Sequence, residues 1–181
     1  MHIKTTLAAL ALTATAATAA DNPMVGGAAM FETKNIVENA VESADHTTLV
    51  AAVQAAGLVE TLASEGPFTV FAPVNDAFAA LPDGTVETLL QPENKDMLTK
   101  VLTAHVVAGD LSGAELMRRA KANGGFYHFN AVSGDALSAQ VRGNSLYIYD
   151  ESGQAGKVTI ADVNQSNGVI HVVDTVLLPK G

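Results

Sequence analysis

The sequence contains no cysteine and no tryptophan, and only 5% of its 181 residues are aromatic. The lack of cysteine excludes disulfide bonds, thiolate metal sites and cysteine nucleophiles, so packing alone must hold the fold together. Hydrophobic residues still make up 48% of the chain, which indicates a sizeable core built from aliphatic side chains and alanine. The length favours one domain, with or without an extension.

Positive charge is also scarce. Ten lysine and arginine residues stand against 19 aspartate and glutamate residues, which gives a formal net charge of -9. Such a chain repels nucleic acid and anionic lipid because both are negatively charged, so we expect no nucleic-acid partner. After residue 20, no segment approaches the roughly 18 continuous apolar residues that a transmembrane helix needs. We therefore expect no transmembrane segment.

The first 20 residues are typical of a secretory signal. Lys4 supplies a short positive start, an apolar run follows at 7–12, and residues 17–19 have the small-x-small cleavage pattern. The sequence therefore predicts a signal peptide over 1–20. It predicts an exported protein that resides in a periplasm, outside the cell or at the cell surface. Residues 21–33 are rich in small side chains and predict a flexible lead-in.

Helical patterns dominate the next part of the chain. Apolar residues at helical spacing, bounded by capping residues, glycine or proline, predict helices over 35–44, 45 or 47 to 56, 58–62, 76–81, 85–90, 92–104 and 116–122. Asn75 is predicted to cap the helix at 76–81, and Ser112 has capping-box spacing to Glu115. The predicted inward stripe of the helix at 92–104 consists of Met97, Leu98, Val101, Leu102 and His105.

Strand patterns dominate the second half of the chain. Apolar or alternating runs separated by short turns predict strands over 68–72, 106–109, 137–142, 146–149, 157–164 and 168–179. Consecutive late strands joined by tight turns imply a mostly antiparallel sheet. The predicted fold class is α+β, and a single domain is expected to cover residues 34–179.

The closing run at 167–179 opens with Asn-Gly and stops at Pro179, as a buried strand does. Neither of its two rows of side chains is consistently polar, so we expect it to be covered on both faces. His171 and Asp174 interrupt the run. Each needs a hydrogen-bond partner, because an unpaired buried polar group costs roughly 1–3 kcal/mol. From the residues alone, the two side chains can either stabilise the core through hydrogen bonds or form part of a functional site.

Recognisable catalytic motifs are absent from the sequence. It has no Gly-x-Ser-x-Gly nucleophile elbow and no glycine-rich phosphate loop. The histidines that follow the signal are His46, His105, His128 and His171. They are scattered singly and lack metal-site spacing, so we predict no catalytic residue, no metal site and no cofactor. The alternative left open is a periplasmic metal or small-ligand carrier that uses Met24, Met30 and histidines.

Two stretches, at 69–78 and 167–179, resemble the two signature boxes of the fasciclin I domain, and an element at 102–109 that contains a histidine lies between them. The resemblance covers about residues 34–179. It implies a wedge of antiparallel strands flanked by several short helices. It also implies structural roles for the polar box residues, which are Asn75, His171 and Asp174.

The same resemblance implies a function. Fasciclin I domains are extracellular or surface modules for adhesion and protein contact, without catalysis. Residues 94–98 are similar to an Asn-Lys-Asp-Ile-Leu motif tied to integrin contact in animal members, and His105 falls at a Tyr-His motif whose aromatic residue is replaced by Ala104. The expected contact residues are Asn94, Lys95, Asp96 and His105. The expected partner is a protein, a cell-surface or matrix component, or a second copy of the chain itself.

Overall fold

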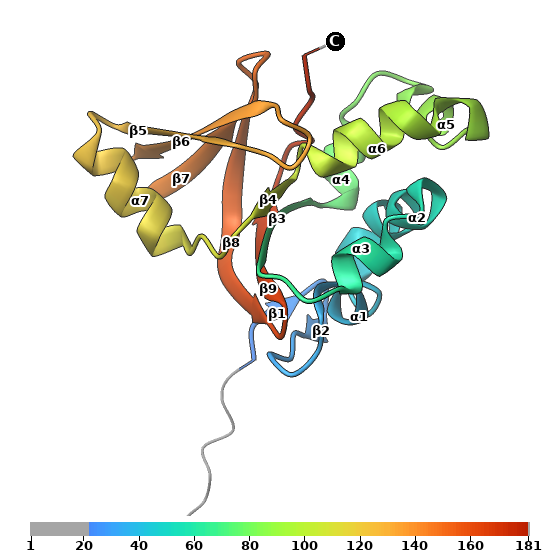
Figure 1. Cartoon of the computed structure of the whole chain (residues 1–181), viewed down its shortest axis with the longest axis horizontal. Helices are drawn as coiled ribbons and strands as arrows, with labels where there is room; N and C mark the ends of the chain where they lie inside the picture. Colours follow the sequence, from blue (N-terminus) through green and yellow to red (C-terminus); the bar gives the residue numbers. More distant parts are fainter. Residues whose placement is uncertain (1–21, 181) are drawn as a thin grey trace, which may run out of the picture.

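The computed structural model describes residues 22–180, so the signal predicted over 1–20 lies outside the described residues. A bent seven-stranded sheet runs through the domain, with helices gathered mainly on one side of it (Figure 1). Its strand order is β4-β3-β9-β8-β7-β6-β5. The strands are β3 (Phe68–Pro73), β4 (Val106–Ala108), β5 (Phe126–Asn130), β6 (Ala136–Arg142), β7 (Ser145–Tyr149), β8 (Ala155–Gln165) and β9 (Gly168–Val173).

All neighbouring strands of this sheet are antiparallel except β3 and β9, which pair in parallel. The late strands follow one another through tight turns, as the sequence predicts, whereas β3 enters from the helical half and lies beside the last strand. The predicted α+β class and the mostly antiparallel sheet are both confirmed.

The helices fall into two groups. Six short helices gather on one side of the sheet, while α7 packs against β5 and β6 (Figure 1). The helices are α1 (Ile36–Ala40), α2 (Thr47–Ala56), α3 (Val59–Ala63), α4 (Asn75–Ala79), α5 (Thr85–Leu89), α6 (Lys95–Thr103) and α7 (Gly113–Ala122), with 3-10 turns η1 (Ala44–His46) and η2 (Pro92–Asn94).

Local signals explain several helix ends. Gly57 adopts a left-handed conformation with φ 73° directly after α2, which suits a residue without a Cβ. The Ser112 hydroxyl accepts a hydrogen bond from the Glu115 N–H at 3.1 Å, so it caps α7 as predicted. Glu115 itself pairs with Arg118 and Arg119 on the same helix, at 2.6 and 2.5 Å.

Two hydrophobic clusters share the central strands. The first cluster joins α1–α6 to one face of β3 and β9, through residues such as Val70 and Ile170. The second lies between the opposite face, α7 and β5–β7, and includes Phe71 and Val173. The prediction that the closing strand is covered on both faces is therefore confirmed for β9.

The closing strand is shorter than predicted. It ends at Val173, and Asp174 is exposed rather than buried. The chain beyond Asp174 still packs inward, with Val176 and Leu177 buried. A side chain holds the backbone of this segment in place: the backbone N–H of Leu177 donates to His105 Nε2 at 2.8 Å.

The lead-in at 21–33 also differs from the prediction of a flexible segment. Residues 24–29 form a hairpin of β1 (Met24–Val25) and β2 (Ala28–Ala29). Gly26 and Gly27 have φ values of 59° and 79°, which a tight hairpin turn requires. Val25 and Met30 are 3% and 2% exposed in the first cluster. The small residues at 26 and 27 thus form the turn that buries their neighbours.

Two predicted orientations are wrong. Met97 is 59% exposed, whereas Leu98, Val101 and Leu102 are buried. Successive side chains on a helix point about 100° apart. Met97 comes one residue before Leu98 and therefore lies beyond the edge of the buried stripe. Asn75 is the first residue of α4 and its side chain does not cap that helix. It contacts η1 and α2 instead.

Candidate functional site

His105 lies directly after α6 and is 2% exposed. Its Nδ1–H donates to the Val101 carbonyl at 2.8 Å, and its Nε2 accepts the Leu177 N–H at 2.8 Å. Burial lowers the pKa of His105 to about 4, which keeps the imidazole neutral. The expectation that His105 contacts a partner therefore needs correction: the side chain is buried, and both ring nitrogens bind within the domain.

His171 is fully buried in β9 and stacks on Phe71 with ring centroids 5.6 Å apart. Its Nε2–H donates to the Leu111 carbonyl at 2.7 Å, and its Nδ1 accepts the Asp162 N–H at 3.2 Å. Burial lowers the pKa of His171, while the carbonyl of Leu111 partly offsets this effect. The Asp162 carboxylate accepts the Gly113 N–H at 2.6 Å, so the histidine and the aspartate join β9 and β8 to the start of α7.

Asp174 and Asn75 make contacts of a different kind. The exposed Asp174 carboxylate accepts the Lys157 N–H at 2.8 Å and so closes the end of the β8–β9 pair. The half-buried Asn75 amide donates to the Ala44 carbonyl at 2.8 Å and accepts the Thr48 N–H at 3.0 Å. Asn75 therefore satisfies a free N–H at the start of α2 from another helix. The side chains of Asn75, His171 and Asp174 share no hydrogen-bond partner in residues 22–180.

The residues at the start of α6 are exposed, with the exception of Asn94. The Asn94 amide donates to the Thr88 carbonyl at 2.8 Å. Lys95, Asp96 and Met97 all reach solvent, and we call these three residues the α6 start. Lys95 Nζ lies near Gly57, 3.4 Å from where a Cβ on that glycine would be. This position suits a cation, because α2 ends there.

An exposed aromatic surface on β5–β7 was not predicted. We call it the aromatic face; it consists of Phe126, His128, Arg142, Tyr147 and Tyr149. The Phe126 and His128 rings stack with centroids 6.4 Å apart. The Arg142 guanidinium lies 5.3 Å from the Tyr147 ring centroid and 5.4 Å from that of Tyr149, and it donates to the Tyr149 hydroxyl.

The alternation of the strands could have revealed this surface. Tyr127 and Phe129 belong to the second cluster, so Phe126 and His128 must point to the opposite side of the same strand. On β7, Leu146 and Ile148 are buried while Tyr147 and Tyr149 are half-exposed. The sequence alone does not show that β5 and β7 flank β6, which brings the two aromatic pairs together.

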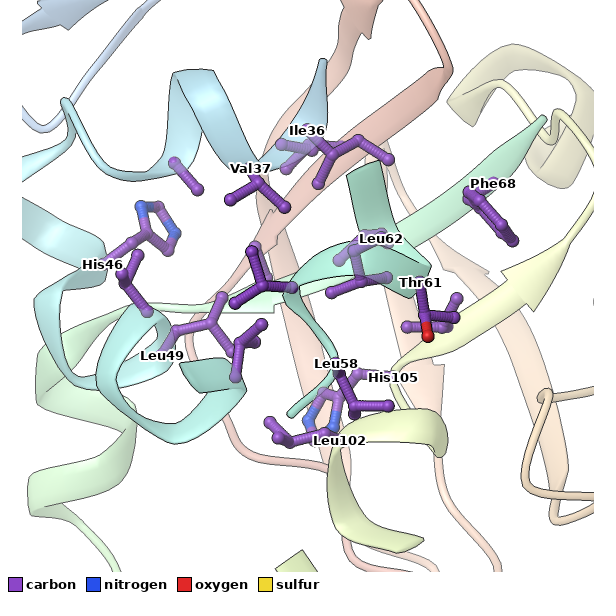
Figure 2. Close-up of a pocket in the computed structure, with 18 of the residues that line it drawn as sticks. Ile36, Val37, His46, Leu49, Leu58, Thr61, Leu62, Phe68, Leu102 and His105 are labelled. Carbon is purple, nitrogen blue, oxygen red and sulfur yellow. The ribbon is translucent and has the colours of Figure 1, made fainter. Parts of the chain in front are cut away.

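A cavity of about 80 Å³ lies among the short helices and β3. Figure 2 shows its lining, which is mostly aliphatic, with His46 and His105 at different sides of the group. Met30 also lines it. His46 belongs to η1, is 3% exposed, and its Nδ1 lies 2.9 Å from the Ser43 hydroxyl. Within residues 22–180, His46 Nε2 makes no hydrogen bond of normal geometry.

The described part of the chain holds no cluster of metal ligands: no three of His, Cys, Asp and Glu gather there closely enough to hold a metal ion. Met24 is 59% exposed and Met30 is buried, so their two thioethers have different surroundings. None of the helices described between residues 22 and 180 combines the length and apolarity that a bilayer crossing requires.

Comparisons with known proteins point in one direction. Residues 44–179 match the family model described as the fasciclin domain. Protein sll1483 of Synechocystis sp. is 49% identical over 156 residues, which cover 86% of this chain and 79% of that protein. The transforming growth factor-beta-induced protein ig-h3 of Sus scrofa is 38% identical over 131 residues, which cover 72% of this chain and 17% of that protein.

A solved structure shows a similar fold. It is a FAS1 domain pair from the insect cell adhesion molecule fasciclin I, and it superposes with a TM-score of 0.58 at 21% sequence identity. The match covers 70% of this chain and 42% of that chain. This likeness confirms the predicted wedge of strands flanked by short helices.

Proposed function

The chain belongs to the fasciclin domain family, and from this premise we propose that it is an exported, non-enzymatic module for adhesion or protein contact. Its partner is a protein, a cell-surface or matrix component, or a second copy of the chain. The domain acts by presenting a rigid surface. The buried histidines support a role without catalysis, because both ring nitrogens of His105 and His171 are occupied by backbone groups.

The aromatic face carries this proposal. It places aromatic rings and an arginine on the open side of three antiparallel strands, with Phe126 40% exposed. Tyrosine and arginine are enriched among the residues that dominate binding energy at protein interfaces. Rings fixed by stacking and by Arg142 lose little freedom on binding, which favours contact with a flat partner.

The α6 start is the second contact candidate. Lys95 and Asp96 supply a polar rim, and Met97 supplies an exposed apolar side chain of a type enriched at interfaces. The outward orientation of Met97 supports this candidate more strongly than the inward one predicted from the sequence. Asn94 serves it indirectly, since its amide holds the turn that precedes α6.

Two variants of the exported chain distinguish the surfaces. One carries Phe126→Ser with Tyr149→Ser, and the other carries Lys95→Glu with Asp96→Lys, which reverses both charges and keeps the net charge. Binding is measured to cells, to an immobilised matrix preparation and, by sedimentation velocity, to the chain itself. We expect the first variant to lose at least tenfold in affinity, or about 1.4 kcal/mol, and the second to lose less.

The matched control is Thr88→Ser, an exposed change outside both surfaces. Its binding should equal that of the unchanged chain. Binding by both surface variants at full strength would refute both contact sites, and failure of the unchanged chain to bind cells, matrix or itself would refute the contact function.

A carrier for a metal ion or small ligand, using Met24, Met30 and histidines, is the second candidate function. One observation favours its small-ligand form: Met30, His46 and His105 line the same cavity. Titration calorimetry with Cu(I), Cu(II) and Zn(II) tests the metal form. We expect no binding tighter than about 1 mM, roughly -4 kcal/mol, since Met30 is enclosed in the core and Met24 is not.

A further inference from the structure

The cavity of about 80 Å³ is too large to be a packing fault between well-fitted side chains. Protein interiors contain few voids larger than a water molecule, and about 10–15 Å³ is enough for a single water. The lining of this cavity is mostly apolar, with Val53, Leu58 and Ile170 among the residues that face it. Water gains few hydrogen bonds in such a space, whereas apolar cavities take up small apolar molecules.

His46 is one of the polar residues in the lining, with Ser43, Gln54, Thr61, Thr103 and His105. The residue is 3% exposed, and its Nε2 makes no hydrogen bond of normal geometry in residues 22–180. A buried nitrogen without a partner costs roughly 1–3 kcal/mol, so a ligand that supplied the missing hydrogen bond would recover that free energy. Burial lowers the pKa of His46. The Ala72 carbonyl, which interacts with the ring only as a distorted hydrogen bond, and the Asp45 carboxylate offset this in part. The ring is therefore a neutral partner.

The second histidine of the lining does not compete for this role. His105 Nδ1 donates to the Val101 carbonyl and its Nε2 accepts the Leu177 N–H, each at 2.8 Å. Its ring therefore offers the cavity no free nitrogen. Only His46 combines burial, a place in the lining and an unpartnered nitrogen within residues 22–180.

The contact between the Ser43 hydroxyl and His46 determines which chemical group of a ligand can bind His46 Nε2. It lies 2.9 Å from His46 Nδ1 and can either donate to that nitrogen or accept from it. In the first case Nε2 carries a proton and donates; in the second it accepts. A ligand hydroxyl can accept from Nε2–H or donate to Nε2, whereas a carbonyl suits only the first case.

We propose that this cavity binds an apolar small molecule with a single hydroxyl group, held by a hydrogen bond to His46 Nε2. The exposed residues Gln54 and Thr61 also belong to the lining, so the ligand enters between α2 and α3. The proposal specifies the ligand class of the small-ligand carrier and rests on no part of the adhesion function. Loss of either surface contact therefore leaves it untouched.

Two probes of nearly equal shape test the proposal: p-cresol, which has a hydroxyl, and p-xylene, which has a methyl group in its place. Each is titrated by NMR into the exported chain and into two variants, His46→Leu and Thr88→Leu. Thr88 is exposed on α5 and is not among the lining residues, so its replacement controls for the exchange of a polar side chain for leucine. Nuclear Overhauser effects to the Met30 methyl group locate each probe.

We expect both probes to contact the Met30 methyl group. His46→Leu should weaken p-cresol roughly three- to tenfold, the value of one hydrogen bond, and should leave p-xylene unchanged or tighter. Thr88→Leu should alter neither affinity. In the unchanged chain, p-cresol but not p-xylene should shift the His46 Nε2 resonance, and this measurement decides the matter if His46→Leu does not fold. Binding of neither probe below about 10 mM, or an equal response of both probes to His46→Leu, would overturn the proposal.

Discussion

At the scale of single residues, the two core histidines use their rings in the same way. In both His105 and His171, one nitrogen donates to a carbonyl and the other accepts a backbone N–H. A neutral imidazole suits such a pair of contacts, because protonation would turn the accepting nitrogen into a donor that faces another donor. These side chains thus join separate parts of the backbone: His105 joins α6 to the segment after β9, and His171 joins β8 to the segment before α7.

The first prediction compares His171 with Asp174. His171→Ala should lower the free energy of unfolding by about 2–4 kcal/mol, because it leaves a cavity beside Phe71 and strips the Leu111 carbonyl and the Asp162 N–H of their partner. Asp174→Ala should cost only about 0.5–1.5 kcal/mol, since that carboxylate is exposed. Urea denaturation followed by circular dichroism measures both. Equal losses, or a larger loss for Asp174→Ala, would contradict the assignment.

Single residues also show what the sequence could predict. Gly57 and Ser112 act through neighbours within one helical turn, so their roles follow from the local sequence. Met97 and Asp174 were misassigned because an apolar pattern does not reveal where a stripe or a strand stops. The unpartnered nitrogen of His46 depends on which side chains surround it in three dimensions, and no local pattern contains that information.

At the scale of elements, one side chain joins three of them. Asn167, in the turn between β8 and β9, accepts the Ile36 N–H at 3.0 Å and donates to the Leu62 and Ser64 carbonyls, both at 2.8 Å. It therefore satisfies the first free N–H of α1 and a carbonyl near the end of α3. The first of these hydrogen bonds joins residues 131 positions apart. The sequence therefore predicts the Asn-Gly turn, but it does not reveal that the Asn167 side chain binds α1 and α3.

The second prediction follows from these three hydrogen bonds of Asn167. Asn167→Ala should lower the free energy of unfolding by about 2–4 kcal/mol, because three backbone groups lose their partner in a largely buried site. The matched control is Asn164→Ala on the adjacent strand, whose exposed amide donates to the Glu32 carboxylate at 3.3 Å. Its cost should stay within about 0.5 kcal/mol. Thermal unfolding of both variants distinguishes the outcomes. Similar melting temperatures would show that the Asn167 side chain does not stabilise the fold in this way.

Elements also differ in how far the sequence specifies them. The late hairpins follow from alternation and turn residues, and their pairing is as predicted. The parallel pairing of β3 with β9 joins segments about 100 residues apart and was not predicted. The same pairing creates the two-sided core, because it places β9 between the helical half and the hairpins.

At the scale of the whole molecule, three neutral histidines distributed over the core couple folding to pH. Burial lowers the pKa of His46, His105 and His171. In the unfolded chain each returns to about 6.5. Between that value and the lower folded value, the unfolded state binds more protons than the folded state, so acid favours unfolding. The stability that the neutral rings provide is complete above about pH 6.5 and is lost as the pH falls below it.

The third prediction is the size of this effect. Between pH 7.5 and 5.5, His105 alone, with a folded pKa of about 4, should lower the free energy of unfolding by about 1.4 kcal/mol, and His46 and His171 should add to the loss. Urea titrations at both pH values measure the difference. In His105→Gln the pH-dependent loss should shrink by about 1.4 kcal/mol, whatever the variant's stability at pH 7.5. A variant whose loss equals that of the unchanged chain would show that His105 does not couple folding to pH.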